Sequence, residues 1–169
     1  MHLQQRQYCE SIKEKYPQHF ENKRVLDVGS MDINGNNRYL FANCEYLGID
    51  LGEGRNVDLV CPIHEFKSNK FDTIISTEML EHDKHWERSL ISMYNLLKKG
   101  GLLMLTAAST NRKEHGTIRT EPKSSPFTND YYKNITVEML NSVLADLQYS
   151  VYEVTISNEG KDIGFILIK

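Results

Sequence analysis

Short apolar runs recur along this chain, and most have the length and composition of buried β-strands. The runs are RVLDV (24–28), EYLGID (45–50), VDLV (57–60), FDTIIST (71–77) and GLLMLTAA (101–108), followed by YSVYEVTIS (149–157) and DIGFILIK (162–169). Charged residues, glycines or other turn-forming residues bound these runs, as expected at strand ends. The pattern therefore predicts seven strands.

Helical periodicity separates some of these strands. The clearest helix carries apolar residues on one face, at Trp86, Leu90, Met93 and Leu97. A second helix is expected where Thr136 can act as an N-cap before the apolar positions of 139–147. Near the N-terminus, Tyr8, Ile12 and Tyr16 form a thin helical stripe that ends before Pro17.

Strands that alternate with helices predict a mostly parallel sheet with helices on both faces, the α/β class. The dipeptide GK at 160–161 indicates a turn, so the last two strands are expected to form an antiparallel hairpin. At 169 residues the whole chain, 1–169, is expected to form a single domain. Ligands of such sheets bind beyond the carboxyl ends of the strands, here just after residues 28, 50, 60, 77 and 108.

Composition narrows the cellular setting. Twenty Lys and Arg against 23 Asp and Glu give a formal net charge of −3, which provides no general attraction to nucleic acid or membrane. Cys9, Cys44 and Cys61 are odd in number and widely spaced, as expected of reduced intracellular thiols. The N-terminal residues lack the apolar core of a signal peptide, and no run is long enough to span a membrane. We expect a cytoplasmic protein that does not contact membranes.

The ends of the first two strands carry residues suited to a nucleoside. Gly29 stands where the backbone must turn sharply, and Gly35 lies near the helix that is expected to follow. Asp50 ends the second strand at the spacing where a carboxylate can accept hydrogen bonds from a ribose diol. Asp27, two residues before Gly29, is unfavourable beside a phosphate but suits a ligand with an ammonium group. These residues favour S-adenosylmethionine over NAD, whose loop needs closer glycines.

Four motifs together resemble the class I S-adenosylmethionine-dependent methyltransferases, in particular the small type 11 methyltransferase-domain group. They are VLDVGS, YLGID, FDTIISTEMLEH and LLKKGGLLMLT, within residues 22–108. The resemblance implies a Rossmann-like fold with a seven-stranded, mostly parallel sheet and a C-terminal antiparallel hairpin. It also implies S-adenosylmethionine as the cofactor.

The resemblance further implies roles for individual residues. Asp27, Gly29 and Ser30 would line the methionine part of the cofactor, Asp50 would bind the ribose hydroxyls, and the backbone of Ile63 would lie near the adenine edge. The remaining candidates for cofactor binding are Gly35, Leu51, Thr77 and Glu78. The loop MDINGNN departs from the family pattern because it is longer and lacks the middle glycine, and Pro62 stands where an aspartate is common.

The stretch EMLEH (78–82) places two carboxylates and an imidazole directly after the fourth strand. In a helix, Glu78, Glu81 and His82 would share one face. These residues could simply form a charged helix start. Alternatively, His82 could be a general base for the acceptor, oriented by a carboxylate such as Glu81.

A third reading makes these residues ligands of Mg²⁺, Mn²⁺ or Zn²⁺, with His115 as a further ligand. E-x-x-E-H with a later histidine resembles the metal site of the small-RNA 3′-end 2′-O-methyltransferases and of the quinone-pathway catechol O-methyltransferases. Glu78, Glu81, His82 and His115 are the candidate set. His82, Glu81 and His115 are also the candidate catalytic residues, and the choice between base, ligand and helix start stays open.

His115 lies in a polar connection, residues 109–135, that lacks clear periodicity and mixes basic with aromatic side chains. Connections of this length in a compact domain are usually functional or disordered. It could contact a small molecule, a sugar or an RNA end, or serve as a solvated lid. We therefore expect methyl transfer to an oxygen or nitrogen of an acceptor that the sequence does not identify. The alternatives are a non-catalytic domain that binds the cofactor or a partner and, less favoured, an NAD oxidoreductase. The sequence does not indicate the oligomeric state.

Overall fold

The computed structural model describes residues 3–169, and its centre is one seven-stranded sheet with the strand order β3-β2-β1-β4-β5-β7-β6. The strands are β1 (Arg24–Val28), β2 (Glu45–Asp50), β3 (Leu59–Val60), β4 (Phe71–Thr77), β5 (Leu97–Ala108), β6 (Val151–Ser157) and β7 (Asp162–Ile168). The first five pair in parallel, whereas β7 runs antiparallel to both β5 and β6. The predicted fold class is thus confirmed.

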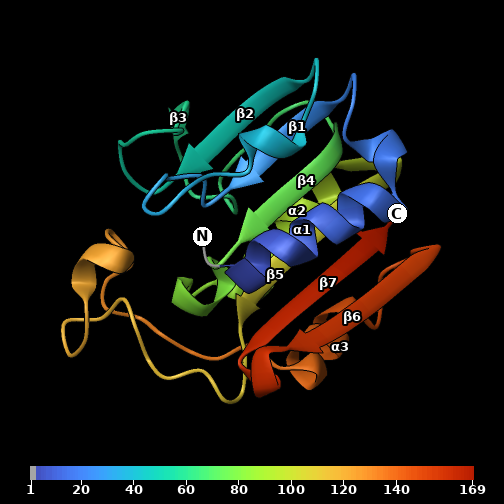
Figure 1. Ribbon diagram of the computed structural model, residues 1–169. Coiled ribbons are helices and arrows are strands. Elements are labelled where there is room, and N and C mark those ends of the chain that lie inside the picture. The colour runs from blue at the N-terminus through green and yellow to red at the C-terminus, as the bar shows by residue number, and fades with distance from the viewer. Residues whose placement is uncertain (1–2) are drawn as a thin grey trace.

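Three α-helices cover the sheet: α1 (Leu3–Lys15), α2 (Trp86–Leu96) and α3 (Val137–Leu144). Figure 1 shows α1 across one face, with α2 and α3 behind the other. Thr136 caps α3 as expected, because its hydroxyl accepts a hydrogen bond from the Met139 amide at 3.3 Å. Among the described residues, none of these helices is long and apolar enough to cross a membrane.

Successive side chains along a strand point to opposite faces of the sheet, so each strand contributes to two separate hydrophobic cores. Leu26 and Ile74 pack toward Leu90 of α2 and Leu140 of α3. The neighbouring positions on the strands pack toward the other face; they include Val25 and Ile75, which share a cluster with Cys9 and Ile12 of α1. Both faces of the sheet are therefore covered by packed helices, and the carboxyl ends of the parallel strands lie side by side along one edge.

Two local expectations were wrong. The helix expected soon after Gly29 is only the three-residue turn Arg38–Leu40. The carboxylate of Asp32 accepts hydrogen bonds from the Gly35 amide and the Asn36 side chain, and such local bonds compete with helix formation. Glu78 is not on a helix face either: its φ is +54° and the only helical residues in EMLEH are Leu80–His82, in a 3₁₀ turn.

The long connection between β5 and α3 lies beyond the carboxyl ends of β1, β2 and β4 (Figure 1). It carries only one short 3₁₀ turn, Pro122–Ser124. The Lys133 amide donates to the Glu81 carbonyl at 2.8 Å, and the Ile135 amide to the Ala108 carbonyl at 2.8 Å. These hydrogen bonds attach the end of the connection to the carboxyl edge of the sheet, where folds of this class bind their ligands.

Candidate active site

A cavity of about 590 Å³ opens at the carboxyl ends of the parallel strands. Its walls come from the ends of β1, β2 and β4, from the loop 31–37, from residues 61–64 and from parts of the long connection. Its volume falls within the range of small-molecule and cofactor sites. All nine residues expected to bind the cofactor line it: Asp27, Gly29, Ser30, Gly35, Asp50, Leu51, Ile63, Thr77 and Glu78.

Asp27 is a buried carboxylate at the base of this cavity, with 1% of its surface exposed. The Tyr46 hydroxyl donates a hydrogen bond to its Oδ2 atom. Its Oδ1 atom is buried and has no hydrogen-bond partner within residues 3–169. Burial raises the pKa of Asp27 to about 6, against the opposing effect of the Tyr46 hydrogen bond. A cationic group could satisfy this oxygen and keep it ionised.

Asn37 is a second polar group at this point, and sequence reasoning missed it. Its Nδ2 atom donates to the Thr77 hydroxyl at 3.0 Å, which fixes the amide across the loop. The Oδ1 atom is buried without a partner in the described part of the chain. The only feature of the sequence that could have indicated Asn37 is its place in the lengthened loop MDINGNN. There an amide side chain stands where the family pattern has glycines.

Asp50 is held by backbone amides at the end of β2. Met31 donates to Oδ2 at 2.9 Å and Leu51 donates to Oδ1 at 2.7 Å, so the carboxylate has a fixed orientation. Burial raises its pKa, and the two amide hydrogen bonds act against that rise. Each oxygen retains a further lone pair, so the group can still accept hydrogen bonds from a ligand.

The backbone next to Asp27 approaches its neighbours closely. Gly29 has a φ of +75°, and a Cβ atom there would lie 2.7 Å from Cγ of Met79, so a side chain would not fit. The Ser30 hydroxyl donates to the Asn56 carbonyl at 2.9 Å, and the Asn56 side chain returns a 2.7 Å bond to the Ser30 carbonyl. This pair of hydrogen bonds therefore joins Ser30, in the cavity wall, to Asn56 in the loop after β2.

Glu78 lies apart from the imidazoles that sequence analysis grouped with it. Its left-handed backbone turns the side chain toward β5, where Oε1 accepts a hydrogen bond from the Thr106 hydroxyl at 2.9 Å. Oε2 lies 3.7 Å from Nη2 of Arg112, which also lies 3.4 Å from Asp162. The left-handed backbone at Glu78 thus directs the first glutamate away from the second.

Glu81, His82 and His115 do come together. One potential ligand atom from each lies within 4.8 Å of the others, and no other His, Cys, Asp or Glu group within residues 3–169 forms such a cluster. His82 and His115 line the cavity, and their ring centroids are 5.0 Å apart. The expectation that a histidine from the long connection would lie beside EMLEH agrees with this geometry.

Burial determines the charge of this cluster. Glu81 is fully buried; its Oε1 accepts from the Ala108 amide at 3.1 Å, and its Oε2 has no partner in the described chain. Desolvation, aided by the charge of Glu78, raises the pKa of Glu81 well above its usual value. Burial is the main cause that lowers the pKa of His82, to about 4, and the nearby His115 lowers it further. The Nδ1 atom of His82 is also buried and has no hydrogen-bond partner in the described chain. The cluster therefore contains polar groups whose hydrogen-bonding capacity is unfilled.

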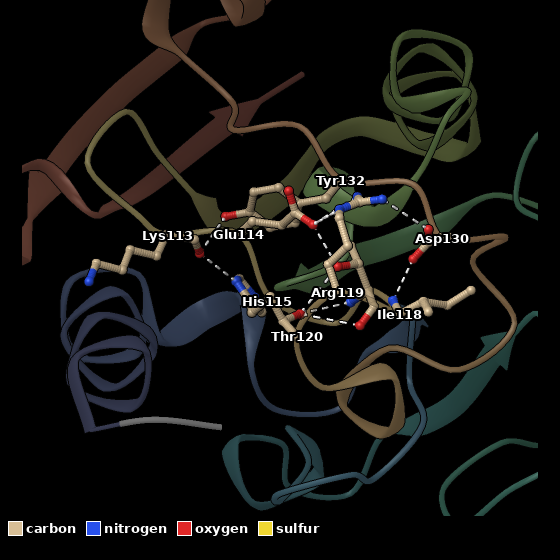
Figure 2. A network of polar contacts seen from close by, with 9 residues as sticks. Lys113, Glu114, His115, Ile118, Arg119, Thr120, Asp130 and Tyr132 are labelled. Carbon is tan, nitrogen blue, oxygen red and sulfur yellow. Dashed lines mark hydrogen bonds and ion pairs between the residues drawn. The ribbon is translucent and has the colours of Figure 1, made fainter.

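A polar network orders the segment that carries His115 (Figure 2). Arg119 donates to Glu114 at 2.8 Å and to Asp130 at 3.3 Å, and Asp130 also accepts from the Ile118 amide at 2.6 Å. The Lys113 carbonyl accepts from the Tyr132 hydroxyl at 3.3 Å and lies 3.2 Å from Nδ1 of His115. The network draws the two ends of the segment together beside His82.

Comparisons with known proteins agree with this geometry. A family model described as a methyltransferase domain matches residues 1–153. No curated protein sequence matches the chain.

Solved structures of low sequence identity share the fold. The 1,6-didemethyltoxoflavin-N1-methyltransferase of Burkholderia thailandensis, with bound S-adenosylhomocysteine, is 14% identical, with a TM-score of 0.68 over 96% of this chain and 76% of that one. Phosphoethanolamine N-methyltransferase 2 of Haemonchus contortus, in complex with S-adenosyl-L-methionine, is 16% identical, with a TM-score of 0.70 over 96% of this chain and 52% of that one.

A third such structure is magnesium protoporphyrin IX methyltransferase of Synechocystis PCC 6803 with bound S-adenosylmethionine. It is 13% identical, with a TM-score of 0.64 over 96% of this chain and 78% of that one. At these identities the likeness is one of fold, whereas the family model extends over most of the chain. The chain belongs to the methyltransferase-domain family and is an S-adenosylmethionine-dependent methyltransferase domain.

Proposed function

We propose that this domain transfers a methyl group from S-adenosylmethionine to a hydroxyl oxygen of a small acceptor, with a divalent cation held by Glu81, His82 and His115. The observation that carries the proposal is the buried cluster at the cavity edge, where Glu81 Oε2 and His82 Nδ1 lack partners in the described chain. Leaving buried polar atoms unpaired costs about 1–3 kcal/mol each, so a structural role alone explains the cluster poorly.

The cofactor would lie along the ends of β1 and β2. Its ammonium group would contact the Oδ1 atoms of Asp27 and Asn37, both buried and unpartnered within residues 3–169. Its ribose hydroxyls would donate to Asp50, and Ile63, 5% exposed, would lie against the adenine. S-adenosylmethionine supplies a methyl group on a positively charged sulfur, which needs only an aligned nucleophile. As the new bond to oxygen forms, the bond between sulfur and methyl breaks and S-adenosylhomocysteine is released. The protein would align the acceptor, and the proton of its hydroxyl group would pass to water.

The residue types at the cluster suit a hard or borderline divalent cation. His82 is neutral near pH 7, because its pKa is lowered to about 4, and metals bind neutral imidazole. A divalent cation bound there would orient a hydroxyl and lower its pKa toward the alkoxide. The proposed ligand set leaves out Glu78, because that carboxylate contacts Thr106 and Arg112.

The same lowered pKa makes His82 a weak general base. Proton transfer is most efficient when the base titrates near the working pH, and His82 titrates well below it. Metal ligation by His82 is therefore the better supported of the two functional roles.

The charge of the cavity favours a neutral or cationic acceptor. Four carboxylates line it, at Asp27, Asp50, Glu78 and Asp83, against the single arginine Arg112 among the described residues. Arg112 is itself close to Glu78 and Asp162. A polyanion such as RNA would meet net repulsion here. The structural neighbours named above act on small molecules by their names, which is consistent with a small acceptor for this chain.

The test is a calorimetric titration of Mn²⁺ into chelator-treated protein saturated with S-adenosylhomocysteine. We expect about one ion per chain for the wild type and none for His82→Ala. His85→Ala, which removes an exposed histidine outside the cluster, should bind like the wild type. Absence of binding to the wild type, or equal binding to His82→Ala, would refute the metal proposal and return His82 to the role of base or structural group.

A further inference from the structure

We propose that Phe127 is a latch that holds the long connection closed over the bound cofactor, so that the cofactor leaves only after the contact between Phe127 and Gly52 opens. This assigns Phe127 a role in retaining and positioning the cofactor. It rests on the cofactor position proposed above, but it does not require the metal.

The latch is a direct contact between two distant segments. A Cβ atom built on Gly52 would lie only 2.3 Å from Cε2 and 2.5 Å from Cδ2 of Phe127. The aromatic ring therefore rests against the bare backbone of Gly52, at a distance that no other residue type would allow. Gly52 is buried, although both of its neighbours in the chain are exposed.

The contact spans the cavity. On one side, Asp50 and Leu51, directly before Gly52, line the cavity next to the proposed ribose position. On the other side, the residues that flank Phe127 line the same cavity: Ser124, Ser125, Pro126 and Thr128. A segment that lines the cavity and touches the far wall at one aromatic ring acts as a roof over whatever occupies the cavity.

The roof is also tied to the residues at the reactive end. Gly116, in the same segment, has a φ of +70°, and a Cβ atom there would lie 2.7 Å from Cε1 of His82 and 2.5 Å from Cβ of Ser125. The network of Glu114, Arg119 and Asp130 joins this part of the segment to the part that follows Phe127 (Figure 2). Opening at Gly52 can therefore proceed while the other end stays packed against His82.

The latch is built to open. Phe127 has a φ of +69°, which is an outlier for a bulky residue and is strained. Phe127 as a whole remains 55% exposed, so the contact leaves much of this residue open to solvent. Asn129 and Asp130 also have positive φ, at +51° and +61°. A strained and partly exposed anchor suits a contact that must break once in each catalytic cycle to exchange the cofactor.

The test measures the dissociation rate of S-adenosylhomocysteine from immobilised protein by surface plasmon resonance. We expect Phe127→Ala to raise this rate about tenfold. Gly52→Ala should raise it similarly, because the new methyl group displaces the ring while Phe127 itself is kept. Ile118→Ala, which removes a 77% exposed side chain in the same connection, is the control and should dissociate like the wild type.

The outcomes separate the latch from the cofactor position. Rates for Phe127→Ala and Gly52→Ala within twofold of the wild type, together with weakened binding by Asp50→Ala, would refute the latch alone. Binding that Asp50→Ala leaves unchanged would refute the proposed cofactor position and the latch with it. A faster rate in only one of the two variants would also overturn the latch, since either change breaks the same contact. Unchanged melting temperatures would show that faster dissociation is not caused by unfolding.

Discussion

The two halves of the cavity are built in different ways. On the proposed cofactor side, Asp27 and Asp50 lie in or at the end of sheet strands, held by Tyr46 and by backbone amides. On the proposed acceptor side, Glu81 and His82 follow β4, but His115 comes from a connection with a single 3₁₀ turn. One half is positioned by the sheet, and the other depends on how a loop folds back.

This difference separates what the fold fixes from what can vary. The pairing of β1 with β2 fixes the positions of Asp27 and Asp50, the proposed cofactor residues, so related domains can share that half. The acceptor half depends on the polar network of Glu114, Arg119 and Asp130, which another loop sequence would replace. Function diversifies in such loops while the scaffold is retained. Substitutions in the two halves should therefore have separable effects.

His82→Ala should produce the largest effect and should confine it to the acceptor half. We expect kcat to fall about 10³-fold, because alignment and deprotonation of the acceptor are lost together. The affinity for S-adenosylhomocysteine should stay within about twofold of the wild type. Steady-state kinetics and calorimetry measure the two quantities, with His85→Ala as the control. A comparable loss of cofactor affinity would mean that the halves are not independent.

Asp27→Asn should affect the cofactor half. We expect about 100-fold weaker binding of S-adenosylhomocysteine, because a buried ion pair with its ammonium group is lost. 5′-Methylthioadenosine lacks that ammonium group and should bind the variant and the wild type equally. Calorimetry with both ligands tests the assignment, and an equal loss for both would place Asp27 away from the methionine moiety.

The stability of the ligand-free domain should also depend on Asp27. Its folded-state pKa of about 6 exceeds the unfolded value near 3.8, so protonation stabilises the folded state. This contribution is fully present below pH 3.8 and is lost as the pH rises through about 6; its size is about 3 kcal/mol. Urea unfolding between pH 4.5 and 7.5 should show wild type losing stability relative to Asp27→Asn. Parallel curves for the two proteins would contradict the raised pKa.

Gly116→Ala should cause the smallest of these effects. The added methyl group would lie 2.7 Å from the His82 ring in a left-handed backbone, so the ring and the loop must shift. We expect about tenfold weaker Mn²⁺ binding with little change in cofactor affinity, as measured by calorimetry. Gly100→Ala, also at positive φ but with open space around its Cβ position, is a matched control for backbone strain. If both variants bind Mn²⁺ like the wild type, the loop does not need to pack against His82.

The sheet was predictable because its signals are local. Apolar runs, the Thr136 cap and the turn before Asp162 are visible in short windows, and the strands and hairpin they predicted are present. The helix expected after Gly29 failed because Asp32 binds its own loop, and Glu78 left its expected face because its backbone is left-handed.

The site was only partly predictable, because it depends on contacts between distant segments. His115 could be paired with EMLEH through a motif, but nothing near Asn37 in the sequence indicates that its amide would bridge to Thr77. The contact between Phe127 and Gly52 leaves no periodic signal either, since both residues lie in irregular backbone. Such contacts follow from the path of the loops, which side-chain hydrogen bonds decide.

The most direct test of the metal proposal is pulsed electron paramagnetic resonance of Mn²⁺ bound to the wild type in complex with S-adenosylhomocysteine. We expect nitrogen couplings from two imidazole ligands, with one coupling lost in His115→Gln and the other in His82→Gln. Two couplings would show that a loop residue and a residue following β4 complete one metal site. Bound Mn²⁺ without histidine nitrogen coupling would contradict that arrangement.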